Sequence, residues 1–198
     1  LKHVEVSNPV GLNLEATLAS QEACYGQRVL PSYRYDKAKL IVSLGYDFLS
    51  DSPNGVEVNR LFADARRYKD DGSMARSVMF EPTLSVTGAT GDERVRVEPA
   101  ALPAIAIALL KELSTLGATI PAGVNLSIDG AGVEKTYGVK EGFIHSLAEE
   151  LWAHKGEGLV LAGGLGAAID GGELLANATN LLNSVLGNDG KTIQYEYQ

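Results

Sequence analysis

The sequence predicts a doubly wound α/β fold, in which helices cover both faces of a mainly parallel sheet. Three short apolar runs, at Leu40–Leu44, 76–80 and Gly158–Ala162, indicate strands that are buried on both faces. Segments with helical periodicity separate these runs, and a glycine or a polar loop follows each one. Strands that alternate with helices are typical of parallel sheets, because parallel neighbours need a long crossover connection.

The size and charge of the chain narrow the classes of protein to consider. Its 198 residues fit a single α/β domain over 1–198, and an apolar share of 45% is enough to form a core. A net charge of −8 disfavours nucleic acid and anionic membrane surfaces, since phosphate binding needs clustered Lys and Arg. Cys24 is the single cysteine, which excludes an internal disulfide and a cysteine-ligated iron–sulfur cluster within this chain. The chain begins with Leu1 instead of Met, so we expect a fragment of a longer protein.

The first half of the chain is expected to contain short elements around a central strand. These are a strand at 3–6, a helix at 14–25 between Asn13 and Gly26, an irregular linker at 31–35, the central strand Leu40–Leu44, a helix from 56 to about 68, a turn at 70–72, a strand at 76–80, a loop at 83–91 and a strand at 94–97. The inner face of the first helix is expected to carry Leu14, Leu18 and Cys24.

The second half is expected to be mostly helical. A strongly apolar helix follows at 100–116, with Pro103 in its first turn, where a missing N–H costs little. Residues 118–138 are rich in glycine and lack a clear period, so we expect an irregular insertion or linker there. The remaining predicted elements are a helix at 139–154, the strand Gly158–Ala162, a helix at 173–186 that buries Leu174, Ala178, Leu181, Leu182 and Val185, and a terminal strand at 190–195.

Two polar groups are the first candidates for a small-molecule site. One is the loop at 45–54 after the central strand, because ligands of open α/β sheets bind beyond the carboxyl ends of strands. The other is Glu81-Pro82-Thr83 with Ser85 and Thr87, whose oxygens could hold the edges of a ribose and a guanine. The alternative is a Glu-Pro turn whose hydroxyl groups bind loop N–H groups, and the residues alone favour this alternative.

Other motifs have simpler interpretations. Residues 163–166 (Gly-Gly-Leu-Gly) could bind an anion through backbone N–H groups, but the dinucleotide fingerprint is incomplete, so we interpret them as a tight turn. The three histidines lack metal-ligand spacing, and we expect no metal site. Ser43 lies inside a strand without the Gly-x-Ser-x-Gly motif of a nucleophile elbow. The paired carboxylates at 70–71 and 149–150 are expected on exposed turns and faces, so we expect no catalytic residue among these motifs.

Three segments, at 36–49, 80–92 and 95–99, together resemble the molybdopterin oxidoreductase (dimethyl sulfoxide reductase) superfamily. Within it they look more like the molybdopterin-oxidoreductase-like part of the iron–sulfur subunit of alternative complex III, a quinol:electron-acceptor oxidoreductase. Segments at 23–33 and 181–191 fit the same pattern, so the resemblance covers most of the chain. It implies a Rossmann-like domain of the type that contacts the guanosine ends of molybdopterin guanine dinucleotide.

The resemblance also implies where a cofactor would be contacted. The residues that it carries over are Gly45, Tyr46, Asp47, Glu81, Pro82, Thr83 and Ser85. The first three match a Gly-x-Asn motif, and the last four match an Asp-Pro-Arg-x-Thr motif that has lost its arginine. Leu102 stands where the family's Pro-Gly-Thr-Asp motif has the aspartate that would bind guanine. The resemblance therefore implies a vestigial site, with neither a catalytic residue nor a metal ligand in this segment.

From this resemblance we expect a scaffold domain without a cofactor in a quinol-oxidising respiratory electron-transfer complex. Iron–sulfur clusters would lie elsewhere in the full chain, and the partners would be other subunits of a membrane-bound complex, without nucleic acid or direct membrane insertion. The implied location is the periplasmic side of the bacterial inner membrane. Two alternatives remain: a fragment of a genuine molybdopterin guanine dinucleotide-dependent oxidoreductase, and a stand-alone nucleotide-binding domain.

Overall fold

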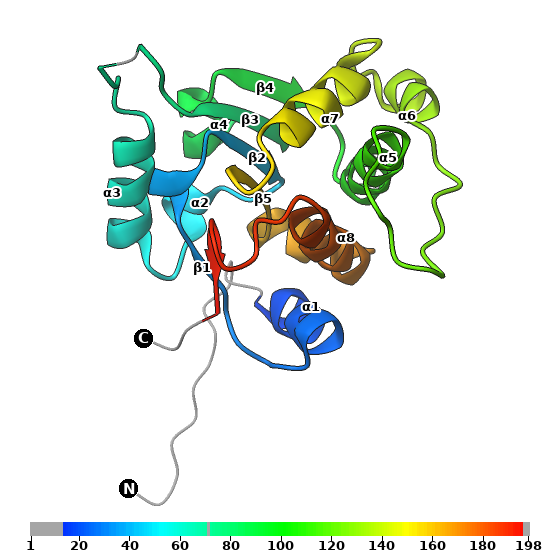
Figure 1. Cartoon of the computed structure of the whole chain (residues 1–198), viewed down its shortest axis with the longest axis horizontal. Helices are drawn as coiled ribbons and strands as arrows, with labels where there is room; N and C mark the ends of the chain where they lie inside the picture. The colour runs from blue at the N-terminus through cyan, green and yellow to red at the C-terminus, as the bar shows by residue number, and fades with distance from the viewer. Residues whose placement is uncertain (1–13, 71, 196–198) are drawn as a thin grey trace, which may run out of the picture.

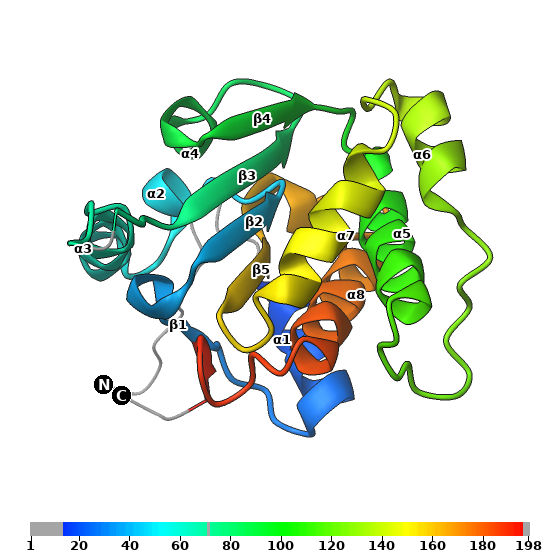
Figure 2. The same cartoon turned by 45° about the horizontal axis from the view of Figure 1, so that its top comes forward.

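A computed structural model of the chain describes residues 14–70 and 72–195. Within these residues the main sheet is parallel and has the strand order β4 (Glu93–Arg96), β3 (Arg76–Glu81), β2 (Leu40–Leu44) and β5 (Gly158–Ala162). Figure 2 shows the four strands in this order, with helices on both sides of the sheet. The predicted doubly wound fold is confirmed. The strand predicted at 3–6 and the predicted cap Asn13 lie outside the described residues.

The helices form two layers around the sheet. One face carries α2 (Phe48–Asp51) and α3 (Gly55–Ala65), and the other carries α5 (Ala101–Thr115), α7 (Phe143–Ala153) and α8 (Gly172–Val185) (Figure 1). The remaining elements are α1 (Glu15–Tyr25), β1 (Ser32–Tyr33), η1 (Tyr35–Lys37), α4 (Val86–Thr90), α6 (Gly130–Tyr137), η2 (Gly164–Ala167) and β6 (Ile193–Gln194), which pairs antiparallel with β1. In the described part of the chain, every helix is too short or too polar to span a bilayer.

The central strand β2 is buried along its whole length because it is apolar on both faces. Leu40, Val42 and Leu44 pack into the core on the side of α5 and α8, while Ile41 packs with Phe48 and its neighbours below α3. Full burial of both faces of a strand is typical of parallel sheets covered by helices. This arrangement places the residues that follow β2 at the carboxyl edge of the sheet.

Two stretches predicted to be irregular contain helices. In the predicted loop at 83–91, Ser85 caps α4, because its Oγ accepts a hydrogen bond from the Gly88 N–H at 2.9 Å. In the predicted linker at 118–138, Asp129 caps α6 in the same way by accepting from the Gly132 N–H at 2.6 Å. Helices this short show too few turns for periodicity to reveal them, although both have a standard capping residue.

Two predicted buried faces are also corrected. In α1, Cys24 is exposed, and the fully buried residues are Ser20 and Gln21. These two bind Asn180 of α8: Gln21 Nε2 donates to Asn180 Oδ1 at 3.1 Å, and Asn180 Nδ2 donates to Ser20 Oγ at 2.7 Å. In α8, Leu174 is half exposed, so its predicted burial is wrong. Polar partners thus decide which face of α1 is buried.

The side chain of Asn183 on α8 takes the place of a neighbouring strand along the open edge of β5. The Val160 N–H donates to Asn183 Oδ1 at 3.0 Å, and Asn183 Nδ2 donates to the Val160 carbonyl at 2.7 Å. Asn188 Nδ2 supports this amide by donating to Asn183 Oδ1 at 3.0 Å, and Thr192 Oγ1 donates to the Gly158 carbonyl at 2.7 Å. The edge strand is therefore closed by side chains, which satisfies backbone groups that burial would otherwise leave unpaired.

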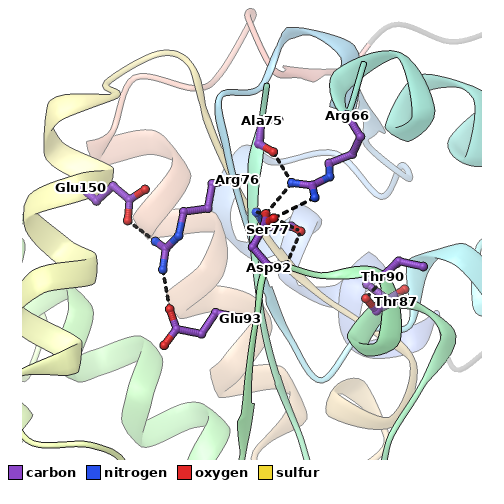
Figure 3. A network of polar contacts seen from close by, with 9 residues as sticks. All are labelled: Arg66, Ala75, Arg76, Ser77, Thr87, Thr90, Asp92, Glu93 and Glu150. Atoms are coloured by element: carbon purple, nitrogen blue, oxygen red, sulfur yellow. Dashed lines mark hydrogen bonds and ion pairs between the residues drawn. The ribbon is translucent and has the colours of Figure 1, made fainter. Parts of the chain in front are cut away.

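A network of charges holds the amino ends of β3 and β4 to the two helical layers (Figure 3). Arg66, at the end of α3, forms an ion pair with Asp92, which also accepts from the Ser77 N–H at 2.7 Å. Arg76 donates to Glu93 at 2.5 Å and forms an ion pair with Glu150 of α7. Burial alone would raise the pKa of Asp92, but the bonds from Arg66 and Ser77 outweigh it and lower that pKa.

Replacing Asp92 with Asn is expected to lower the free energy of unfolding by about 1 kcal/mol at neutral pH. The pKa of Asp92 is lower in the folded chain than in the unfolded chain. The ionised carboxylate therefore stabilises the fold fully at pH values above the unfolded-state pKa of about 3.9. This stabilisation is lost as the pH falls through the folded-state pKa. Urea unfolding at a series of pH values should therefore show the variant and the parent converging below about pH 4.

The matched control is Asp64→Asn, because Asp64 pairs with Arg67 on the exposed side of α3 at 3.2 Å. This change should cost less than about 0.5 kcal/mol at any pH. A difference between Asp92→Asn and the parent that stays constant down to acidic pH would contradict a role for the ionised carboxylate.

Candidate functional site

The candidate site lies where the chain order changes direction across the sheet. The chain continues from β2 to β3 and β4 on one side, whereas β5 pairs with β2 on the other side. The loops that follow the carboxyl ends of β2 and β5 therefore run away from each other. Ligands of open α/β sheets bind in the crevice at such a switch point. The two loops still touch: the Gly166 N–H donates to the Gly45 carbonyl at 3.2 Å.

Gly45 and Leu102 fill the bottom of this crevice. Gly45 has a φ of +74°, and a Cβ atom placed on it would lie 2.6 Å from Leu102 Cδ1. Only glycine fits there, both because of the positive φ and because Leu102 occupies the space. Leu102 has 0% exposure and belongs to the main core. The position that the family resemblance assigns to guanine recognition is therefore part of the packed interior.

Asp47, the polar residue of the predicted Gly-x-Asn match, binds α4. Its Oδ1 accepts from the Thr87 N–H at 2.9 Å and from Thr87 Oγ1 at 2.6 Å. Thr87 Oγ1 in turn accepts from the Leu49 N–H at 3.2 Å, and Thr87 is buried. The Asp47 carboxylate thus connects the loop after β2 to the helix after β3.

Glu81 and Ser85, like Asp47, form bonds with other residues of the fold. Glu81 is 2% exposed, forms an ion pair with Arg94 of β4 and accepts through Oε1 from the Ser85 N–H at 3.3 Å. The Ser85 hydroxyl caps α4, as described above. Among the described residues, Glu81 Oε2 is a buried oxygen without a hydrogen-bond partner. Thr83 is exposed and Pro82 has no N–H, so this motif forms a Glu-Pro turn with internal bonds.

A cavity of about 140 Å³ lies beside these residues, between the loops after β2 and β5 and the segment before β1. Its walls include Leu30, Tyr33, Tyr46, Asp51 and Glu57. Of the seven predicted contact residues, only Tyr46 lines this cavity within the described part of the chain. The structure therefore separates the predicted site into an internally bonded group and an open cavity.

Glycines after β5 shape one wall of the cavity. The Tyr46 ring packs on Gly163, where an added Cβ would lie 3.1 Å from Tyr46 Cδ2. A Cβ on Gly164, which has a φ of +51°, would lie 3.1 Å from Asp51 Oδ2. The Asp51 carboxylate thus faces the loop after β5, and burial, together with the nearby charge of Asp47, raises its pKa. The tight turn predicted at 163–166 is present as η2 and its flanking residues.

Sequence reasoning found one side of this cavity and missed the other. Asp51 falls in the loop at 45–54 that we predicted as the place to look. Tyr33 was assigned to an irregular linker, and Glu57 to a helix, without a role in a site. The one available signal was the run of aromatic residues at 31–35, because tyrosines near strand ends often face ligands or cores.

The described residues contain no group of three or more His, Cys, Asp and Glu side chains that could hold a metal ion. His145 lies on exposed α7 and its Nδ1 contacts Glu112 Oε2 at 2.8 Å. The hydrogen bond with Glu112 raises the pKa of His145 above its usual value. This is a surface pair between two helices, as expected for an isolated histidine.

No family model matches the chain, and no curated protein matches its sequence. Among solved structures, acetylene hydratase from Pelobacter acetylenicus is similar, with a TM-score of 0.69 and 12% sequence identity. The match covers 92% of this chain and 26% of that chain, so this chain spans about a quarter of the length of its structural neighbour. At this identity the likeness concerns the fold alone, and both the superfamily resemblance and the closer likeness to alternative complex III stay predictions. The chain thus has the fold of a segment of acetylene hydratase.

Proposed function

We propose that this chain is a molybdopterin-oxidoreductase-like scaffold domain that binds no pterin cofactor and serves a quinol-oxidising respiratory complex. The observation that carries the proposal is the burial of Leu102 against Gly45, at the position where the family's guanine-binding aspartate would stand. A leucine side chain cannot accept a hydrogen bond, and here it also fills the space above the loop after β2. The fold is retained, whereas the recognition chemistry is lost.

The polar residues of the motifs support the same conclusion. Asp47 Oδ1 is bonded to Thr87, and Glu81 Oε1 is bonded to Arg94 and to the Ser85 N–H, so these two oxygens serve contacts within the fold. A nucleotide would have to break these bonds, and each lost bond to a buried group costs about 1–3 kcal/mol. The residues present therefore do not fit the guanosine end of a pterin dinucleotide, and we derive no chemical step through that cofactor.

The likeness to acetylene hydratase, a molybdopterin enzyme of the dimethyl sulfoxide reductase family, supports the superfamily part of the proposal. The carboxyl edge of the sheet suits contact with other domains or subunits, because apolar side chains are exposed there. Leu84 and Val86, after β3, and Leu165, after β5, are 68%, 54% and 48% exposed. Exposed apolar residues that gather along one edge favour protein contacts. The periplasmic side of a bacterial inner membrane is the proposed location.

Metal and pterin analysis of the full-length protein tests this function. The purified complex is expected to oxidise quinol while containing far less than one atom of molybdenum or tungsten per chain, and acid extraction should release no pterin. A known molybdopterin enzyme prepared in parallel provides the positive control for the extraction. Stoichiometric molybdenum or tungsten would instead identify a fragment of a genuine molybdopterin-dependent oxidoreductase.

Thermal unfolding with guanosine and adenosine nucleotides distinguishes the remaining alternative. A ligand at about 100 times its Kd adds roughly 2.7 kcal/mol to stability, which is a readily measured shift in Tm. We expect no shift with any of these nucleotides. A shift with one of them would favour a stand-alone nucleotide-binding domain.

A further inference from the structure

We propose that the cavity between the loops after β2 and β5 binds a small organic cation, namely an amine or amidine carried on an apolar body of about one six-membered ring. Its walls are built by four segments far apart in the sequence: 14–17, 30–33, 46–61 and 162–164. This inference is independent of the scaffold role, since it concerns a cavity that shares only Tyr46 with the predicted pterin contacts.

The size of the cavity limits the ligand. Its volume is about 140 Å³, and a cavity of roughly 150 Å³ lined by apolar side chains is known to hold one benzene ring. Leu30, Pro31, Val58 and Leu61 supply apolar walls here. A purine nucleoside or a dinucleotide is therefore too large to be enclosed, whereas a single ring or a short aliphatic chain fits.

The charge of the walls determines the sign of the ligand. Asp51 and Glu57 line the cavity, and none of the residues that line it is Lys, Arg or His. The nearby Arg34 is held by Asp36, to which it donates from Nε at 2.9 Å and from Nη2 at 2.6 Å, and it attracts Glu57 only weakly. The cavity thus has a negative potential that repels phosphates and carboxylates and attracts a cation.

Asp51 is the main proposed partner of that cation. Its carboxylate lies close to Gly164, which also lines the cavity, and the structure gives it neither an ion pair nor a hydrogen bond among the described residues. A partly buried carboxylate without a counter-charge gains the most from a bound cation, because the pair forms in a low-dielectric surrounding. Glu57 is exposed and stands at the mouth of the cavity.

Tyrosines complete the recognition of a cation. Tyr33 and Tyr46 line the cavity, and the faces of aromatic rings attract cations. Behind Tyr33, with ring centroids 6.3 Å apart, Tyr35 is 0% exposed and its hydroxyl has no hydrogen-bond partner among the described residues. Tyr35 does not itself line the cavity, so its contribution is to support the Tyr33 ring from behind.

Titration with small probes followed by NMR tests the proposal. Benzylamine and benzamidine are expected to shift the resonances of Tyr46, Gly163 and Gly164 with saturable binding, whereas benzyl alcohol and benzoate, of similar size, are expected to bind at least about tenfold more weakly. Equal binding of the alcohol would overturn the role of charge. Absence of saturable shifts with both cations would overturn the proposal itself.

Two variants and one control assign the binding to the carboxylates. Asp51→Asn should weaken benzylamine binding about tenfold or more, and Glu57→Gln should weaken it less, because Glu57 is exposed. Asp64→Asn removes the same charge from α3 seven residues beyond Glu57, outside the residues that line the cavity, and should leave the affinity unchanged. Affinities that fall equally in Asp51→Asn and Asp64→Asn would indicate only a general effect of net charge and would overturn the site.

Discussion

Replacing Asn183 with Ala is expected to lower the free energy of unfolding by about 3–5 kcal/mol, because the change leaves several buried polar groups without partners. Val160 is 0% exposed, and both its N–H and its carbonyl bond to the Asn183 side chain. Asn188 Nδ2 also loses its acceptor, and Asn188 is fully buried. Each orphaned group costs about 1–3 kcal/mol, so the sum is large compared with the 5–15 kcal/mol of a typical domain.

Urea unfolding of this variant and of Asn177→Ala measures the effect. Asn177 lies on the same helix, and among the described residues its side chain accepts a long contact of 3.7 Å from the exposed Cys24 thiol and no other bond, so its loss should cost less than about 0.5 kcal/mol. Hydrogen exchange adds a local readout, since the Val160 amide should lose its protection first in Asn183→Ala. Equal stabilities of the two variants would mean that Asn183 does not close the edge of β5.

The same residues show why part of the fold could be predicted from the sequence. β2 and β5 are nearly continuous apolar runs and β3 has an apolar centre at 78–80, and burial on both faces is a local property that composition reveals. The long helix α5 was predicted for the same reason, since its residues are almost all apolar and Gly117 follows it with a φ of +99°. Where the burial of apolar residues determines an element, the pattern of apolar residues in the sequence is sufficient to predict that element.

The helix faces that were mispredicted, on α1 and α8, are those where bonds between polar side chains determine which residues are buried. Periodicity counts apolar residues, so it favoured Leu174 and Cys24 as buried positions. In the structure the buried positions are Ser20, which binds Asn180, and Asn183, which binds the edge of β5. Each of these bonds joins residues that are at least 23 positions apart in sequence, as the Val160–Asn183 pair shows. A pattern in one segment cannot reveal a partner in another.

The candidate site could be predicted only in part for a similar reason. The loop after β2 was located correctly as one side of a crevice, because parallel topology fixes where strands end. The bond between Asp47 and Thr87 spans 40 positions, so the sequence did not reveal that this carboxylate is used within the fold. The cavity needs four distant segments, and its Tyr33 wall belongs to β1, which pairs with β6 near the other end of the chain.

Replacing Leu102 with Asp is expected to cost at least about 4 kcal/mol and to leave little folded protein. The change restores the residue type that the family's motif carries, but it removes a side chain with 0% exposure and buries a carboxyl group in its place. Loss of a buried leucine alone costs about 2–5 kcal/mol, and an unpaired buried carboxyl adds to this even if its pKa rises and it stays neutral.

Leu84→Asp is the matched control, because Leu84 is 68% exposed on the connection that follows β3. It should change the free energy of unfolding by less than about 0.5 kcal/mol. Circular dichroism and urea unfolding measure both variants, and guanosine diphosphate is added to each. If Leu102→Asp folded with nearly the stability of the parent and bound guanosine diphosphate, the leucine at 102 would be a minor substitution in a cleft that can still bind nucleotides. A large loss of stability without nucleotide binding would mean that this part of the cleft belongs to the hydrophobic core. That result fits a scaffold domain and does not fit a cofactor-binding site.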